Sequence, residues 1–304
     1  MEVRPSYLKL LESGQLDKRV ERARKMFSPC TLCPHQCKVN RMDDEKGFCR
    51  IGRRAVVASF GAHFGEEPPI TGKRGSGTVF FSGCNLKCVF CQNFEISQGL
   101  EGHEVEKEYL AFIFLSLQEG GCHNINLVTP THVILPILEA LLLAAKEGLK
   151  IPIVYNCGGY ESIETLRLLD GIVDIYMPDM KYSDDETGLK YSRVKNYWKF
   201  CKEAVKEMYR QVGNLRIDAS TGAAYRGLLI RHLVLPGDLS GTKKVCEFIA
   251  RELSPDTVVN IMDQYRPCGM AAKYPPLDRR ITPEEFARAV RWAKEAGLTN
   301  LLTF

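Results

Sequence analysis

The chain has 304 residues, of which 45% are hydrophobic and 26% charged, the balance of an ordinary globular protein. It opens without a signal pattern, and its most apolar run, residues 133–145, is too short to cross a bilayer. The formal charge of +4 is too small to favour nucleic-acid binding. We therefore expect a cytoplasmic protein without a membrane partner, and the charge does not favour a nucleic-acid partner.

The first 60 residues differ from the rest of the chain. A helical pattern over 6–27 precedes a loop-rich segment, 28–54, that carries Cys30, Cys33, Cys37 and Cys49. Such a segment buries too little apolar surface to hold itself together, so we expect a metal to stabilise it. Four thiolates suit either a structural zinc ion or a [4Fe–4S] cluster. We expect residues 1–60 to form a cysteine-rich metal module and residues 61–304 the main domain.

Six apolar, β-branched runs then alternate with helical patterns, which predicts a parallel α/β sheet. The runs are 78–82, 125–129, 152–155, 172–177, 228–235 and 257–262. One helix is expected over 186–210, and a last helix begins at Thr282 with Glu285 completing a capping box. Six units are too few for an eight-unit barrel, so a partial barrel or an open sheet follows. In both, the site lies at the C-terminal ends of the strands.

The loop after the first predicted strand reads SGCNLKCVFCQN and carries Cys84, Cys88 and Cys91. Without a secretion signal, cysteines at this spacing indicate metal binding or catalysis rather than disulfides. Soft thiolates select zinc, copper(I) or iron–sulfur clusters, and three of them leave one iron of a four-iron cluster open. An open metal position can bind and activate a small molecule.

This loop resembles the signature of the radical S-adenosylmethionine (SAM) superfamily, including Phe90 before the last cysteine. The resemblance implies a partial (β/α)6 barrel and a [4Fe–4S] cluster on Cys84, Cys88 and Cys91, with SAM on the open iron. In that family an electron from the cluster cleaves SAM, and the 5′-deoxyadenosyl radical abstracts hydrogen from a substrate. A one-electron donor such as ferredoxin or flavodoxin is therefore an implied partner.

Two longer stretches narrow the resemblance within the superfamily. GSGTVFFSGCNLKCVFCQNFEISQ and RGLLIRHLVLPG are most similar to the pyruvate formate-lyase activating enzyme group. They are also similar to its relatives with an extra N-terminal cysteine module. In activating enzymes the radical passes to a backbone glycine of a partner enzyme.

The resemblance also suggests which residues hold SAM. The second predicted strand ends in VTPTH where the family usually has a Gly-Gly-Glu stretch, so Thr129, Thr131 or His132 is expected to contact SAM or to cap the next helix. The third strand ends in YNCGGY, where Asn156, Gly158 and Gly159 permit either a close approach of SAM to the backbone or a plain turn.

The fourth and fifth predicted strands end in charged residues. Asp179 and Lys181 point to one face of an extended chain and are similar to an Asp-x-Lys pair that meets SAM in activating enzymes. Arg231 and His232 interrupt an apolar strand, and only one of the two can face the interior. A carboxylate on SAM would pair well with Arg231.

These features predict a radical SAM oxidoreductase that abstracts hydrogen from a protein or peptide, as in the activation of glycyl radical enzymes. No separate substrate domain is visible, which favours a macromolecular substrate. An alternative is a small metabolite or RNA; a small substrate would need a lid, from residues 62–76 or 211–226. A non-enzymatic iron–sulfur scaffold or electron carrier is the third hypothesis, and the three-ligand cysteine loop argues against it.

Overall fold

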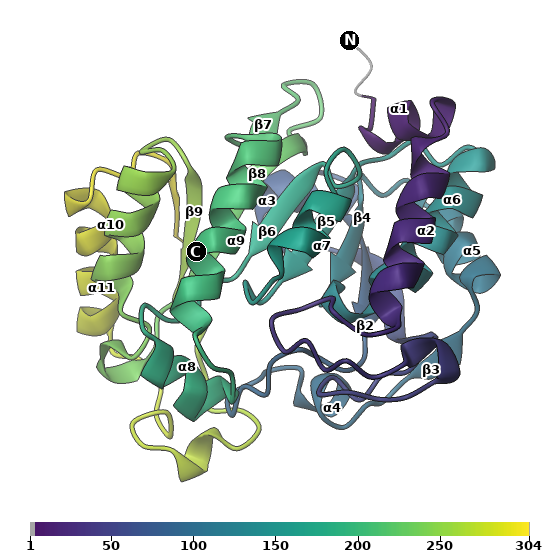
Figure 1. The fold of residues 1–304 in the computed structure, drawn as a ribbon. Helices are drawn as coiled ribbons and strands as arrows, with labels where there is room; N and C mark the ends of the chain where they lie inside the picture. The colour runs from purple at the N-terminus through teal and green to yellow at the C-terminus, as the bar shows by residue number, and fades with distance from the viewer. Residues whose placement is uncertain (1–3, 304) are drawn as a thin grey trace.

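The computed structural model describes residues 4–303, which form an α/β fold around one curved, unclosed sheet (Figure 1). The strand order is β10-β9-β8-β6-β5-β4-β2-β1-β3, with β7 paired to β8 outside this path. The strands are β1 (Ala55–His63), β2 (Ser76–Phe81), β3 (His103–Val105), β4 (Ile125–Val128), β5 (Ile153–Cys157), β6 (Ile175–Pro178), β7 (Arg216–Ile217), β8 (Ala224–Leu233), β9 (Val258–Met262) and β10 (Leu301–Leu302).

The six predicted strands correspond to β2, β4, β5, β6, β8 and β9, and neighbours among them pair in parallel. The run IVYNC of β5 is buried at every position, as expected for a parallel strand covered on both faces. β1 and β3 extend one edge with antiparallel pairing and β10 extends the other in parallel. The prediction of a partial parallel barrel is therefore confirmed.

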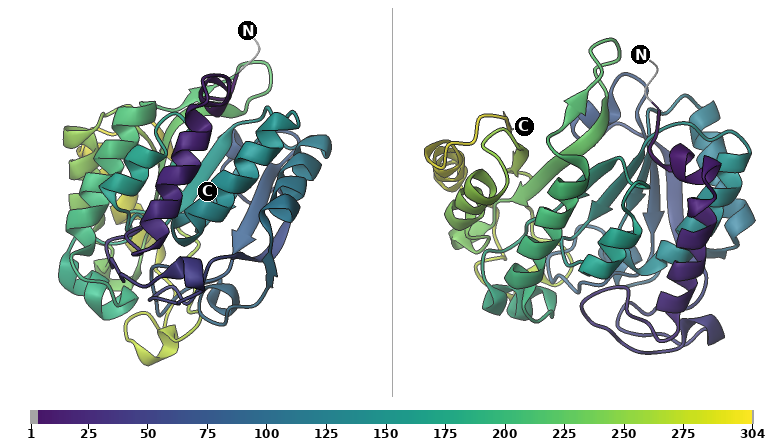
Figure 2. Two further views of the ribbon diagram at one scale, coloured as in Figure 1. Left: turned by 45° about the vertical axis from the view of Figure 1, so that its right-hand side comes forward. Right: turned by 45° about the horizontal axis from the view of Figure 1, so that its top comes forward.

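Most of the helices lie on the outer face of the sheet, as the turned views in Figure 2 show. The helices are α1 (Tyr7–Glu12), α2 (Gln15–Phe27), α3 (Pro68–Thr71), α4 (Phe94–Ser97), α5 (Lys107–Glu119), α6 (Ile134–Lys146), α7 (Ile163–Leu168), α8 (Asp185–Ser192), α9 (Tyr197–Val212), α10 (Thr242–Glu252) and α11 (Pro283–Glu295). Within residues 4–303, no helix combines the length and the apolar character needed to span a bilayer.

Helix boundaries follow local sequence where a cap is present. Thr282 accepts a hydrogen bond from the Glu285 amide and Glu285 reaches back, so the predicted capping box of α11 is confirmed. The single helix predicted over 186–210 is instead two helices, α8 and α9. Arg193 and Asn196 adopt left-handed backbone angles with φ of 56° and 57°, which ends one helix and starts the next.

The N-terminal 60 residues share the core of the barrel. Tyr7, Leu16 and Leu32 are fully buried and belong to the same apolar cluster as the barrel helices. Helix α2 packs on α6, where Arg24 pairs with Glu139 at 2.6 Å. The expected domain boundary at residue 60 also falls inside β1. Residues 4–60 therefore share their apolar core with the barrel helices.

The two segments considered as lids approach the barrel from the end opposite the cysteine loop, and His63, Gly65 and Glu66 of the first segment line the inner wall of the cavity at the strand ends. Ile70 of α3 enters the barrel and packs on an inner apolar cluster of Val154, Ile175, Met177, Ala224 and Leu229. β7 pairs with the first residues of β8. Because β4, β5, β6 and β8 all begin at this end, neither segment covers the C-terminal ends of the strands.

Candidate active site

A cavity of about 400 Å³ opens at the C-terminal ends of the parallel strands. This volume lies within the range of small-molecule sites, roughly 300–1,000 Å³. Ten of the fourteen site residues expected on the barrel line the cavity, namely Cys84, Cys88, Phe90, Cys91, Thr129, Asn156, Gly158, Asp179, Lys181 and Arg231. These residues come from five separate segments. The parallel topology brings them together because the carboxyl ends of the strands lie at one edge of the sheet.

The cysteine loop is held in shape by the C-terminal turn of α8. The amides of Lys87 and Val89 donate to the carbonyls of Ser192 and Tyr191, at 3.0 and 2.9 Å. Phe90 turns into the core, where its ring meets Tyr182 and Tyr265 edge-on. These contacts fix the backbone on both sides of Cys88, so the three sulfurs are presented to the cavity by a braced loop.

Each of the three sulfurs has a hydrogen-bonding neighbour. The Leu86 amide donates to Cys84 Sγ at 3.3 Å, the Ser97 hydroxyl donates to Cys91 Sγ at 3.2 Å, and the Ser192 hydroxyl lies 2.9 Å from Cys88 Sγ. Burial raises the pKa of Cys84 to about 12 and of Cys88 to about 11. Bound iron would hold them as thiolates, and the donors would stabilise that charge. The loop therefore fits a thiolate-bound iron–sulfur cluster.

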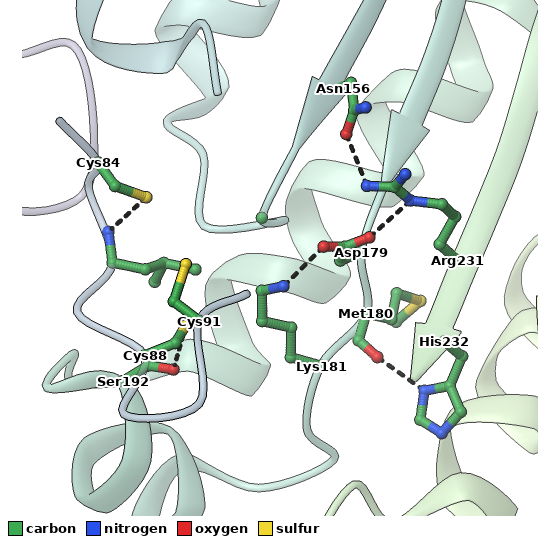
Figure 3. A network of polar contacts seen from close by, with 12 residues as sticks. Cys84, Cys88, Cys91, Asn156, Asp179, Met180, Lys181, Ser192, Arg231 and His232 are labelled. Carbon is green, nitrogen blue, oxygen red and sulfur yellow. Dashed lines mark hydrogen bonds and ion pairs between the residues drawn. The ribbon is translucent and has the colours of Figure 1, made fainter. Parts of the chain in front are cut away.

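A charged network crosses the cavity from β8 to the cysteine loop (Figure 3). Arg231 donates to Asp179 at 2.8 Å and to Asn156 at 2.7 Å, and Lys181 donates to the other Asp179 oxygen at 2.6 Å. Burial alone would raise the pKa of Asp179, but Arg231 and Lys181 outweigh it and hold that pKa below its ordinary value. The Lys181 ammonium also attracts the Cys88 thiolate. Lys181 thus places a positive charge between the carboxylate and the cysteine loop.

Glu66 is a site residue that sequence reasoning missed. It follows β1, lines the cavity from within the barrel, and lies 3.3 Å from Arg231 and 3.1 Å from Asn126. Burial raises the pKa of Glu66 and Arg231 opposes this. Two carboxylates already match the charges of Arg231 and Lys181, so Arg231 needs no carboxylate from SAM. The only signal in the sequence was the acidic pair before two prolines in FGEEPPITG.

His232 does not face the cavity, so its predicted contact with SAM is corrected. Its Nδ1 donates to the Met180 carbonyl at 2.7 Å, and its Nε2 lies 2.9 Å from the Thr242 hydroxyl of α10. Burial lowers its pKa to about 4. Figure 3 shows Arg231 turned toward Asp179 and His232 toward Met180, as alternation along β8 requires. Arg231 is therefore the one of the pair that faces the interior.

Three further predicted SAM contacts lie outside the cavity and serve the fold. Thr131 donates to Glu161 at 2.8 Å, and His132 Nε2 lies 2.8 Å from the Ser82 carbonyl. Both side chains are buried behind the strand ends. Gly159 has a φ of +77°, and a Cβ there would lie 2.6 Å from the Asp179 carbonyl oxygen. Its glycine is needed for the approach of two strand ends, rather than for SAM.

Glu161 is buried behind the site and accepts hydrogen bonds from Thr131 and Tyr155. Burial raises its pKa to about 7, so between about pH 4.5 and 7 the folded state keeps a proton that the unfolded state has lost. Stability therefore falls as pH rises through this window, by about 3 kcal/mol from this residue. We expect Glu161→Gln to remove that fall. Urea unfolding from pH 4.5 to 8 measures it, with exposed Glu147→Gln as control; an unchanged pH slope in Glu161→Gln would contradict the prediction.

The four N-terminal cysteines also gather in space. Cys33 is half-buried, and the charges of Cys30, Cys37 and Cys49 act on it. Arg41 is buried beside Cys30, and its guanidinium is bonded to the carbonyls of Gly52 and His132 and to no carboxylate among the described residues. As placed, no three His, Cys, Asp or Glu side chains of residues 4–303 converge on a single-ion site. The four cysteines and a buried cation make a setting that suits an anionic, thiolate-bound group.

Comparison with known proteins places the chain in a family. Residues 78–221 match the model of the Radical SAM superfamily. An uncharacterized protein of Methanocaldococcus jannaschii is 35% identical over 300 residues, which cover 96% of this chain and 82% of that protein. The chain belongs to the radical SAM superfamily. Membership implies an enzyme with a [4Fe–4S] cluster, SAM and a reductant.

Two solved structures are among those to which part of the chain is similar. A domain of a pyruvate-formate lyase-activating enzyme from Bacteroides vulgatus has a TM-score of 0.36 at 14% identity, over 65% of this chain and 91% of that one. The structure of anSMEcpe with bound AdoMet has a TM-score of 0.49 at 12% identity, over 72% of this chain and 61% of that one.

Proposed function

We propose that this enzyme reductively cleaves SAM and uses the 5′-deoxyadenosyl radical to abstract hydrogen from a protein or peptide, as the activating enzymes of glycyl radical enzymes do. The observation that carries the proposal is the meeting of Cys84, Cys88 and Cys91 with the Asp179–Lys181 pair in one cavity. When bound by the three cysteines, a [4Fe–4S] cluster would supply the electron and the open iron for SAM.

The residues of the chain then have separate tasks. Hydrogen bonds from Leu86, Ser97 and Ser192 stabilise negative charge on the three sulfurs. Lys181 and Asp179 offer a cation and a carboxylate to the polar methionine part of SAM, and Arg231 keeps Asp179 ionised.

The ends of β4 and β5 form the cavity wall that faces the cysteine loop. A Cβ at Gly158 would lie 2.5 Å from Leu86 Cδ1, so a larger residue would have to displace the Leu86 side chain of the cysteine loop. Thr129 adopts a φ of +59° and its amide donates to the Asn156 carbonyl at 2.8 Å, which turns the end of β4 along the cavity. We propose Thr129, Asn156 and Gly158 as the remaining SAM contacts.

Two observations support a macromolecular substrate. The sheet stays open between β3 and β10, so the barrel is not sealed at its side. The segments considered as lids enter from its other end, so they do not cover the C-terminal ends of the strands. We further propose that Cys30, Cys33, Cys37 and Cys49 hold a second [4Fe–4S] cluster rather than zinc, and that ferredoxin or flavodoxin supplies the electron.

The origin of the abstracted hydrogen tests the proposal. Source cells are grown in deuterated medium, and their anaerobic extract is separated into macromolecules and metabolites. Each fraction is incubated with the reconstituted, reduced enzyme and unlabelled SAM. The deuterium content of the 5′-deoxyadenosine formed is then measured by mass spectrometry. We expect deuterium from the macromolecular fraction, lost after protease and retained after ribonuclease. Deuterium from metabolites alone would overturn the protein substrate, and loss after ribonuclease would indicate RNA.

A further inference from the structure

The two cysteine groups lie against each other through their backbones. Gly83 precedes Cys84 with a φ of +80°, and a Cβ at this position would lie 2.8 Å from the Cys49 carbonyl oxygen and 2.5 Å from Ile51 Cγ1. His35, from the N-terminal group, places Nε2 2.9 Å from the Asn85 carbonyl oxygen. The segment that holds four cysteines and the loop that holds three are therefore in direct contact.

Lys87 lies at this contact and has a buried, unpartnered ammonium. Its Nζ makes no hydrogen bond within the part of the chain that the structure describes, and it lies over the Phe48 ring, 5.4 Å from the ring centroid. A buried ammonium without hydrogen bonds or a counter-charge is strongly unfavourable. One cation–π contact does not replace the water molecules that the three N–H donors of the ammonium lose on burial. The charged form of Lys87 is therefore favourable at this position only beside an anionic partner.

The anions within reach come from both cysteine groups. Cys84 of the loop and Cys49 of the N-terminal group attract the Lys87 ammonium, whereas Arg50 and Arg193 repel it. Arg41 is the other buried cation of this region. Unlike Lys87, it already has partners, because its guanidinium donates to the Gly52 carbonyl and attracts the Cys30 thiolate. Lys87 is thus placed to attract thiolates of both cysteine groups, and its ammonium makes no hydrogen bond within the described residues.

We propose that Lys87 is a shared counter-ion that stabilises the metal-bound thiolates of both groups and couples their charge states. The inference rests on the proposed function only in that both cysteine groups hold metal. Coupling between sites is reciprocal. Metal binding to the N-terminal cysteines would therefore attract Lys87 away from Cys84, and the cluster held by Cys84, Cys88 and Cys91 would become harder to reduce. The N-terminal group would therefore set the reduction potential of the site without touching SAM.

The test uses two full-length backgrounds that each keep one metal group. Cys30→Ala/Cys33→Ala/Cys37→Ala keeps the site cluster, whose midpoint potential is measured by an EPR-monitored redox titration. Cys84→Ala/Cys88→Ala/Cys91→Ala keeps the N-terminal group, whose metal loss to a chelator is timed; this readout serves for iron and for zinc. Lys87→Met is compared in both with Lys87→Arg, which keeps the charge, and with Lys46→Met, an exposed lysine between Cys37 and Cys49.

We expect Lys87→Met to lower the one-electron reduction constant of the site cluster about tenfold, a shift of 59 mV to more negative potential. We expect it also to speed metal loss from the N-terminal group about tenfold, while Lys87→Arg and Lys46→Met change neither value. With all cysteines present, the potential shift should be smaller, because Lys87 is then divided between two groups. An effect on one group alone, or an equal effect of Lys87→Arg, would overturn the proposal. Neither readout involves SAM, so failure of the proposed function stays distinguishable.

Discussion

Alanine at Cys84, Cys88 or Cys91 is expected to abolish 5′-deoxyadenosine formation. Each sulfur would hold one iron, so the loss of one sulfur would leave a cluster with two open iron positions. The hydrogen-bonding neighbour of that sulfur would also lose its partner. The backbone of the loop is fixed by amide bonds to Ser192 and Tyr191 that do not involve the sulfurs. The variants should therefore fold, and the loss should come from the metal site.

Iron content and 5′-deoxyadenosine yield, both measured after anaerobic reconstitution, test this expectation. Cys246→Ala is the control, because Cys246 is a buried cysteine on α10 outside the cavity. The control should keep full iron content and full product yield, with only a small loss of stability from the missing sulfur. Wild-type product yield in any one of the three loop variants would exclude this loop as the SAM-cleaving site.

The sequence alone could predict the placement of the cysteine loop, because that inference needs only a strand before it and a parallel sheet. Strand runs of four to six apolar residues identified β4, β5 and β6, and the C-terminal ends of parallel strands meet at one edge. Asp179 and Lys181 were found in the same way, since residues two apart in an extended chain share a face. These inferences depend on local periodicity, which a single sequence contains.

The remaining site residues depend on long-range packing that local patterns do not contain. Glu66 reaches the cavity because α3 packs inside the barrel and its Ile70 is buried between strands more than 80 residues away. Arg231 and His232 could not be told apart until the pleat of β8 was known. Thr131 and His132 follow the same strand as Thr129, but the short helical turn after β4 rotates them into the core.

Arg231 holds two largely buried carboxylates together, so its loss is expected to have the second-largest effect. Arg231→Met leaves Asp179 and Glu66 without their shared counter-ion in a largely buried setting. Breaking a buried ion pair by removing one partner lowers the free energy of unfolding by about 3 kcal/mol. Lys181 would remain attached to Asp179, so we expect weakened SAM binding in addition to the loss of stability. Urea unfolding and equilibrium SAM binding measure the two effects.

Arg210→Met provides the matched control, because Arg210 also pairs with two carboxylates, Glu207 and Asp170, but is 55% exposed. Exposed pairs contribute about 0–1 kcal/mol, so this variant should remain close to the wild type. The two variants should also differ in pH dependence. Without Arg231, the pKa values of Asp179 and Glu66 rise, so the deficit should be largest near pH 8 and shrink as acid protonates them. Equal losses in the two variants at pH 8 would show that the Arg231 network is no more than a surface pair. A deficit confined to Arg231→Met and relieved by Glu66→Gln would place the effect in the buried carboxylates, because Gln keeps the side-chain shape and removes one uncompensated charge.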